Sequence, residues 1–185
     1  MKRRQDGVTL IEVMISTVVV SVGLLGVFQL HLVAKRSSYE SFQYTQAHAL
    51  ATDIVERMRV NASQVAAYVS RDYGMGVFVP PARTCASFDF DHSLCAPAEI
   101  RQWDQYRWEE MLVGRDEQID DRNVGSANAM RGCITAANGE VEVVVSWRGM
   151  DETTDGALGG TAALCGVSDA RRRSVRIATR IVDSI

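Results

Sequence analysis

Proline, the residue that most often interrupts helices, is scarce in this sequence and comes late. The chain has three prolines, and the first of them is Pro80. Lysine and arginine are absent from residues 8–34, where Glu12 is the one acidic residue. Because neither a helix breaker nor a run of charge interrupts this stretch, the sequence predicts one long helix with an apolar first half.

Histidine is scarce as well, and no two cysteines form a Cys-x-x-Cys pair. His31 falls in the apolar segment, His48 in the predicted helix and His92 between two cysteines. None of them has a neighbouring motif that recruits a Ser or Cys nucleophile. The sequence therefore lacks the nucleophile, base and orienting group of a hydrolase, and it predicts no enzyme, no cofactor and no metal site.

Two acidic groups resemble metal ligands only weakly. Asp89, Asp91 and His92 share one predicted loop, and three potential ligands on a loop more often stay in solvent. The acids of residues 151–155 lack the alternating spacing of oxygen ligands in a calcium loop. Neither group changes the prediction that the chain holds no metal.

A strong excess of positive charge is missing too. The formal net charge is -3, so the whole chain has no basic surface of the kind that binds nucleic acid. The arginine run at residues 171–173 precedes a predicted strand, where such a run favours a solvated face or the guard of a sheet edge. Contact with DNA is the less favoured alternative.

Four cysteines are present: Cys85, Cys95, Cys133 and Cys165. An even number of cysteines in a chain with an export signal indicates disulfides in an oxidising compartment. Four cysteines allow three pairings. The pairing Cys85–Cys95 with Cys133–Cys165 is favoured because its first bond closes a short local loop, and four free thiols are the alternative.

The first residues resemble an export signal with an unusual order. Residues 1–7 carry three basic residues and end in Gly7, and the apolar run follows. A secretory signal peptide has its small-residue cleavage site after the apolar run instead. If cleavage occurs between Gly7 and Val8, the apolar segment becomes the start of the mature protein.

Residues 8–34 are long enough to cross a bilayer, which needs about 20 apolar residues. The basic leader favours a cytoplasmic N-terminus and places the rest of the chain outside, although Lys35 and Arg36 argue weakly the other way. Glu12 is costly in such a segment unless it is paired. Cleavage after Gly7 creates a partner, the amino group of Val8 in a neighbouring subunit.

The pattern of basic residues, Gly7, Val8 and Glu12 before about 20 apolar residues resembles the signal of type IV pilins and type II secretion pseudopilins. The resemblance implies cleavage after Gly7 by a prepilin peptidase, N-methylation of Val8 and assembly into a helical fibre through Glu12. Other pilins and an inner-membrane assembly platform are the implied partners. The first mature residue is usually Phe in the family and is Val8 here.

The helix is predicted to continue to Arg59 with an amphipathic second half. Its apolar stripe, suited to covering a sheet, is Phe42, Ala47, Leu50, Ile54 and Met58. Asp53 and Arg57 are spaced as an i,i+4 ion pair on its flank. This gives four parts: a leader (1–7), a membrane half of the helix (8–34), an amphipathic half (35–61) and a periplasmic head (62–185).

The head is predicted to contain one helix and a small sheet. The helix is expected at residues 98–113 and the strands at 133–136, 140–148 and 174–182, with an Asn138-Gly139 hairpin turn between the first two. Residues 114–131 and 149–173 are expected as loops. The predicted fold class is α+β: the type IV pilin fold, a long helix packed on an antiparallel sheet of three or four strands.

The head also resembles the PilV family of minor pilins, the type IV pilus modification proteins. The matching residues are Cys85, Cys95, Pro97, Glu99, Trp103, Asp104 and Trp108, with Asp53, Arg57, Met58 and Arg59 of the helix. The resemblance implies a low-abundance subunit that primes pilus assembly at the bacterial inner membrane. A type II secretion pseudopilin and a membrane-anchored periplasmic enzyme or receptor with an uncleaved anchor remain the alternatives.

Overall fold

The computed structural model of the protein describes residues 7–85, 94–155 and 159–182. The chain divides into two units, residues 1–41 and residues 42–185. Helix α1 (Leu10–Val60) belongs to both, and its first part makes up the structured portion of the first unit. The second unit contains the head (62–185) together with the second half of α1, and it holds every other helix and strand of the described residues.

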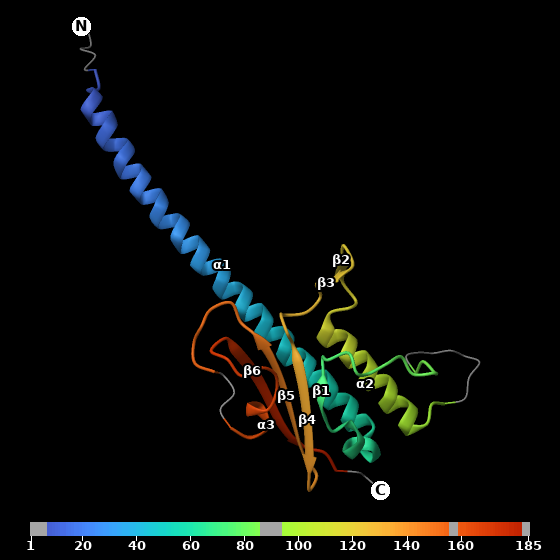
Figure 1. The fold of residues 1–185 in the computed structure, drawn as a ribbon. Helices are drawn as coiled ribbons and strands as arrows, with labels where there is room; N and C mark the ends of the chain where they lie inside the picture. The colour runs from blue at the N-terminus through green and yellow to red at the C-terminus, as the bar shows by residue number, and fades with distance from the viewer. Residues whose placement is uncertain (1–6, 86–93, 156–158, 183–185) are drawn as a thin grey trace, which may run out of the picture. The chain divides into compact units, whose positions relative to one another are not determined.

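The second half of α1 forms part of the core of the head. Its buried residues recur every three or four positions: Gln43, Ala47, Leu50, Ala51, Ile54, Val55 and Met58. This period places them on one helix face. Figure 1 shows this part of α1 running behind β4 and β5. The predicted stripe is confirmed except at Phe42, which is 62% exposed because the buried face begins one residue later, at Gln43.

Four antiparallel strands form the sheet of the head, in the order β1-β4-β5-β6. They are β1 (Ser70–Tyr73), β4 (Arg131–Ala137), β5 (Glu140–Arg148) and β6 (Arg172–Arg180). Asn138 and Gly139 connect β4 to β5 with φ values of 52° and 78°. Positive φ at both positions is what a two-residue hairpin turn requires, so the predicted turn is confirmed.

The two faces of the sheet carry different residues. Val141, Val143, Val145 and Trp147 of β5 face α1 and belong to the main core, as their alternation predicts. Val144 faces the other way and packs in a small second cluster with Cys133, Ala162 and Cys165. The α+β fold of a long helix packed on a small antiparallel sheet is therefore confirmed.

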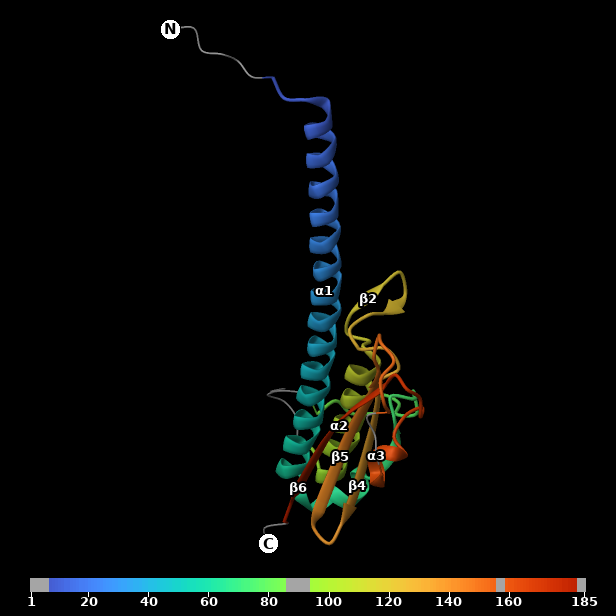
Figure 2. The ribbon, with the colours of Figure 1, turned by 90° about the vertical axis from the view of Figure 1, so that its left-hand side faces the viewer.

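Helix α2 (Pro97–Val113) lies beside α1 in the head (Figure 2). Pro97 occupies its first turn, where a missing N–H costs nothing, and the Glu99 carboxylate accepts a hydrogen bond from the Ala96 N–H at 2.8 Å. Gly114 ends the helix in the left-handed conformation, with φ of 71°. The helix predicted at residues 98–113 is thus confirmed to within one residue.

Several small elements were not predicted. A 3₁₀ helix, η1 (Ala62–Tyr68), leads into the edge strand β1, whose sequence Ser-Arg-Asp-Tyr has no apolar alternation. The predicted loops contain a hairpin of β2 (Gln118–Ile119) and β3 (Arg122–Asn123) and the four-residue helix α3 (Gly160–Ala163). Strand β6 begins and ends two residues earlier than expected. These elements are too short or too polar to produce a period in the sequence.

Candidate processing and assembly site

Gly7 and Val8 lie before the first turn of α1, outside any helix or strand. Both are exposed, and a Cβ placed on Gly7 would contact nothing within 4 Å. The peptide bond between them is therefore unhindered within the described residues. The leader residues 1–6 lie outside the part of the chain that the structure describes.

Glu12 occupies the first turn of α1. Its backbone N–H donates to the Thr9 carbonyl at 3.1 Å, and its exposed carboxylate lies near the positive end of the helix dipole. Val8 and Glu12 line one shallow surface groove of about 410 Å³, together with Ser16 and Thr17. The structure thus places the predicted docking carboxylate on the same helix surface as the residue that would become the new N-terminus.

The hydroxyl groups near Glu12 are satisfied within the helix. Ser16 Oγ donates to the Glu12 carbonyl at 2.7 Å, Thr17 Oγ1 to the Met14 carbonyl at 2.8 Å, and Ser21 Oγ to the Thr17 carbonyl at 2.6 Å. Hydroxyls bonded in this way need no water or partner in an apolar environment. Glu12 is the one acidic residue of positions 8–34, and its carboxylate, unlike these hydroxyls, would be costly in an apolar environment without a partner.

The segment around Glu12 has the composition of a membrane span. An 18-residue window of α1 has a mean hydropathy of 2.3, and none of it is buried. Length and composition therefore allow α1 to cross a membrane, as the sequence predicts.

A second group of residues, several of which belong to the head pattern described from the sequence, lies where α1, η1 and α2 meet. Arg57 donates to Asp53 at 2.7 Å and to Asp104 at 2.9 Å, and Tyr68 OH donates to the other oxygen of Asp104 at 2.7 Å. Asn61 Nδ2 donates to the Pro97 carbonyl at 2.8 Å. The predicted Asp53–Arg57 pair is confirmed, and Asp104 extends it across to α2.

The pKa shifts of Arg57 and Tyr68 agree with this contact between α1, η1 and α2, which is called the joint between α1 and α2 below. Burial by itself lowers the pKa of Arg57, but hydrogen bonds to Asp53 and Asp104 outweigh it, and the net pKa is raised. Burial, followed by the hydrogen bond to Asp104, raises the pKa of Tyr68 above its ordinary value. The guanidinium stays charged and the phenol stays protonated near neutral pH. This group thus includes residues that hold the head together.

The two tryptophans of this pattern have different environments. Trp108 is fully buried, and its Nε1–H donates to the Leu50 carbonyl of α1 at 2.9 Å. Trp103 is only partly buried and makes a tilted ring contact with Tyr106 at 5.9 Å. Trp108 therefore connects α2 to α1 through a buried hydrogen bond, whereas Trp103 lies on the outer side of α2.

A buried carboxylate next to Trp108 was missed by sequence reasoning. Glu109 is fully buried, and the backbone N–H groups of Gly74 and Gly76 donate to its two oxygens. Both glycines have positive φ values, which lets the turn after β1 point its amides at one acceptor. The sequence offered only the two glycines as a sign of a turn.

The prediction of a solvated face at the arginine run 171–173 is wrong for Arg172, although the run does lie at the start of the edge strand β6. Arg172 is 3% exposed and donates from Nε and Nη2 to the two oxygens of Asp155, both at 2.7 Å. Its Nη1 donates to the carbonyls of Ala163 at 3.0 Å and Cys165 at 3.3 Å. The sequence missed this because Asp155 lies 17 positions away in a loop with no periodic pattern.

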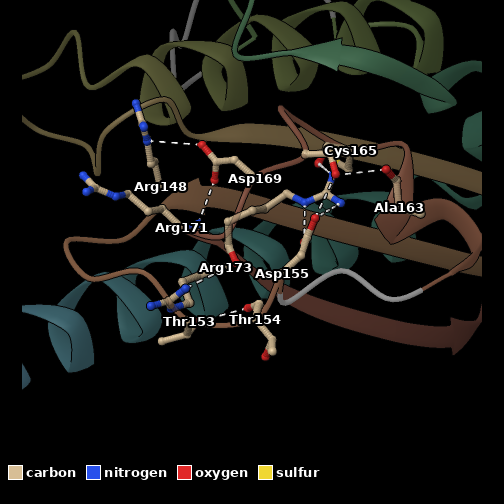
Figure 3. A network of polar contacts seen from close by, with 11 residues as sticks. Arg148, Thr153, Thr154, Asp155, Ala163, Cys165, Asp169, Arg171 and Arg173 are labelled. Atoms are coloured by element: carbon tan, nitrogen blue, oxygen red, sulfur yellow. Dashed lines mark hydrogen bonds and ion pairs between the residues drawn. The ribbon is translucent and has the colours of Figure 1, made fainter.

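The neighbouring Arg171 and Arg173 bond to residues of the same loop, which precedes β6 (Figure 3). Arg171 Nη2 donates to Glu152 at 3.1 Å, and Arg173 Nη2 donates to the Asp151 carbonyl at 2.9 Å. Asp169 accepts from the Arg171 N–H at 2.8 Å and pairs with Arg148 at 3.4 Å. Because acids and carbonyls of the head occupy these groups, the run gives no support to a DNA-binding surface.

Two disulfides are present in the head. Cys85 bonds to Cys95 across a Cα–Cα distance of 6.2 Å, and Cys133 bonds to Cys165 across 5.8 Å. These are the two pairings that the sequence favours. The second bond ties β4 to the loop that carries the carbonyl groups bound by Arg172.

The other candidate residues do not assemble into a site. The described residues include no group of three or more His, Cys, Asp and Glu able to hold a metal ion. His31 and His48 are both exposed on α1, and His92 with Asp89 and Asp91 lies outside the described residues.

The comparison with known families agrees with the N-terminal geometry. The family described as the prokaryotic N-terminal methylation motif matches residues 2–28. A search of curated proteins and a search of solved structures find no match to the chain. The matched residues include Gly7, Val8 and Glu12. The chain therefore carries the N-terminal methylation motif of type IV prepilin-like precursors.

Proposed function

We propose that this protein is a minor pilin of a bacterial type IV pilus. It is made as an inner-membrane precursor with a leader of residues 1–7, a membrane half of α1 at 8–34, an amphipathic half at 35–61 and a periplasmic head at 62–185. The observation that carries the proposal is the methylation motif at residues 2–28 on a helix whose second half packs against an antiparallel sheet.

The processing steps follow from the chemistry of the first turn. Prepilin peptidase cuts between Gly7 and Val8, and the amine of Val8 is methylated. The new amine is positively charged, and in an assembled bundle Glu12 of one subunit pairs with it on the next. An unpaired carboxylate in the apolar core of a membrane or a fibre is costly, so this pairing favours the assembled state over the separate subunits.

The role of a minor pilin rests on the head. The residues that resemble PilV include Asp53, Arg57, Asp104 and Trp108, which form the joint between α1 and α2. The proposed partners are other minor and major pilins and the inner-membrane assembly platform. The proposed activity is priming of pilus assembly and surface display, with roles in twitching and adhesion and with no enzymatic step or nucleic acid.

The first test is intact-mass measurement of the full-length protein purified from the membrane. The proposal expects loss of residues 1–7 and one added methyl group. A protein that keeps its leader would instead be a single-pass anchor. Processing does not separate a minor pilin from a type II secretion pseudopilin, so the second measurement is rescue of a deletion strain, scored for twitching and for protein secretion.

The second test is Glu12→Ala, which should leave membrane insertion intact and reduce the amount of the protein in sheared pili. The matched control is Glu56→Ala, which removes an exposed carboxylate from the same helix, where it pairs with Arg59 at 2.6 Å. Normal pilus content in the Glu12 variant would show that this carboxylate has no docking role.

A further inference from the structure

Strand β6 is an edge strand of the sheet and lies next to β5 (Figure 1). Its pairing with β5 keeps one unbroken register from Arg172 to Arg180. The opposite edge strand, β1, has four residues and an irregular register, and short, irregular edge strands resist pairing with another chain. The sheet therefore has one protected edge and one long, regular edge.

The hydrogen bonds to β5 show which backbone groups of β6 point outward. The Ile181 N–H donates at 3.0 Å to the carbonyl of Gly139, the residue opposite it, and hydrogen-bonded pairs alternate along an antiparallel ladder. The odd-numbered residues of β6 therefore bond to β5, and the N–H and C=O groups of Arg176, Ala178 and Arg180 point away from it. None of these outward groups has a partner within the described residues.

The spacing of these groups suits an extended chain. They recur at every second residue, about 7 Å apart, which is the spacing of donors and acceptors along a neighbouring strand. Ala178 is exposed beside them, and it lines a groove of about 340 Å³ together with Arg176 and Glu142. Strand addition gains affinity from such backbone groups and specificity from pockets for alternate side chains.

The charge of β6 limits which strand can pair with it. The strand contains four arginines and no acid. Arg172 and Arg173 bond inside the head, and Arg176 pairs with Glu142 at 2.7 Å. Arg180 is exposed and forms no ion pair with any residue that the structure describes. A second copy of β6 would bring arginines against arginines, so this edge disfavours self-pairing and favours a strand with acidic residues.

We propose that the edge of β6 from Arg176 to Arg180 binds an extended, acidic strand of a different pilin subunit. The added strand continues the sheet past β6 and places an acidic side chain next to Arg180. The inference rests on the proposed function, because it requires other pilins as partners. It gives the head a contact separate from the pairing of Glu12 with Val8.

The experiment compares amide hydrogen exchange in the full-length protein in detergent, alone and after purification with co-expressed pilins of the same bacterium. In the protein alone, β5 should protect the amides of residues 175, 177 and 179, and the amides of residues 176, 178 and 180 should exchange freely. In the complex, exchange of this second set should slow by about tenfold or more. An unchanged rate at these three amides would overturn the inference.

Ala178→Pro removes one outward N–H and keeps the bonds to β5, because an edge strand tolerates proline where the N–H faces solvent. It should lower the yield of the complex about tenfold. The matched control is Ala178→Ser, which keeps the N–H and should change the yield less than about twofold. Equal yields for the two variants would contradict the strand contact.

A charge reversal gives a second test, which holds if the proline variant loses the protection of residues 175–179 by itself. Arg180→Glu should lower the yield about tenfold, because an acid then faces an acidic strand. Its control is Arg71→Glu, which reverses an exposed arginine on β1 and should leave the yield unchanged. A yield that does not distinguish the two reversals would count against the acidic partner.

Leader removal and pilus content are measured in the same strains. A wild-type protein that keeps residues 1–7 would refute the proposed function. A protein that is processed and enters pili, but binds no other pilin through slower exchange at residues 176, 178 and 180, would refute the strand contact alone.

Discussion

The two halves of α1 differ in the burial of their side chains and in the partners of their hydrogen bonds. In residues 10–34 no side chain is buried, and the hydroxyls of Ser16, Thr17 and Ser21 bond to carbonyls of their own helix. In residues 43–58 seven side chains are buried, and Leu50 and Arg57 bond to α2. The first half therefore bonds its hydroxyls within its own helix and leaves its apolar side chains exposed, whereas the second half packs inside the head.

This contrast predicts that changes in the head and changes near Val8 have separable effects. A head variant should alter the free energy of unfolding without preventing removal of the leader. A variant at Glu12 should alter assembly without changing the stability of the head. The following variants test the first of these statements.

Trp108→Ala should have the largest effect. It removes a fully buried ring and leaves the Leu50 carbonyl without its donor, at a cost of about 3–5 kcal/mol. Thermal unfolding of the full-length protein in detergent, followed by circular dichroism, should show a midpoint lower by about 10 °C. Trp103→Ala on the outer side of α2 is the control and should shift the midpoint much less. Similar shifts for both would contradict the assigned joint.

Arg172→Met should come next. It leaves Asp155 and the carbonyls of Ala163 and Cys165 without their shared donor, and removal of one partner of a buried pair costs about 3 kcal/mol or more. Arg176→Met is the control, because Arg176 is 61% exposed and its pair with Glu142 adds little. Urea unfolding of both variants measures the difference. Equal losses would mean that burial of Arg172 does not matter.

Arg172 also shows which features of the fold cannot be predicted from the sequence. The long helix, α2, the Asn138-Gly139 turn and the α1-facing side of β5 follow from periods and turn signals within short windows. The Arg172–Asp155 pair, Glu109 with its two glycine amides, and strand β1 depend on contacts between distant segments. Such contacts leave no local period, so Arg172, which looks solvated in the sequence, proves to be buried.

The candidate site residues also differ in how far the sequence alone predicts them. Gly7, Val8 and Glu12 could be singled out in the sequence because the methylation motif is defined by residues at fixed spacing along the chain. Asp53 and Arg57 could be predicted as an i,i+4 pair from their spacing, whereas Asp104 appeared in the sequence only as part of a family pattern. The structure supplies their physical reason, which is the connection between α1 and α2.

Gly132→Ala should have a smaller effect. A Cβ at this position of β4 would collide with the Trp108 ring and touch Leu112, and overpacking of this kind costs about 1–3 kcal/mol. Thermal unfolding measures the loss. The double variant Gly132→Ala with Trp108→Phe makes room for the methyl group, so it should be less destabilised than the sum of the two single changes. Strict additivity would show that the glycine is not needed for the tryptophan.

Tyr68→Phe should have the smallest effect at neutral pH, about 1 kcal/mol, through the lost hydrogen bond to Asp104.

The effect of Tyr68→Phe on stability depends on pH. Burial and then Asp104 raise the pKa of Tyr68 in the folded head, while in the unfolded chain the phenol titrates near its ordinary value of about 10. The contribution from this shift is therefore fully present below about pH 10 and declines as the pH rises toward the folded pKa, because the unfolded state releases its proton first. Wild-type protein should lose midpoint temperature between about pH 9 and pH 11 more steeply than the variant. Part of the slope should remain in the variant because burial also raises the pKa of Tyr73. Identical slopes in the two proteins would show that the Tyr68 phenol is not held protonated by the joint between α1 and α2.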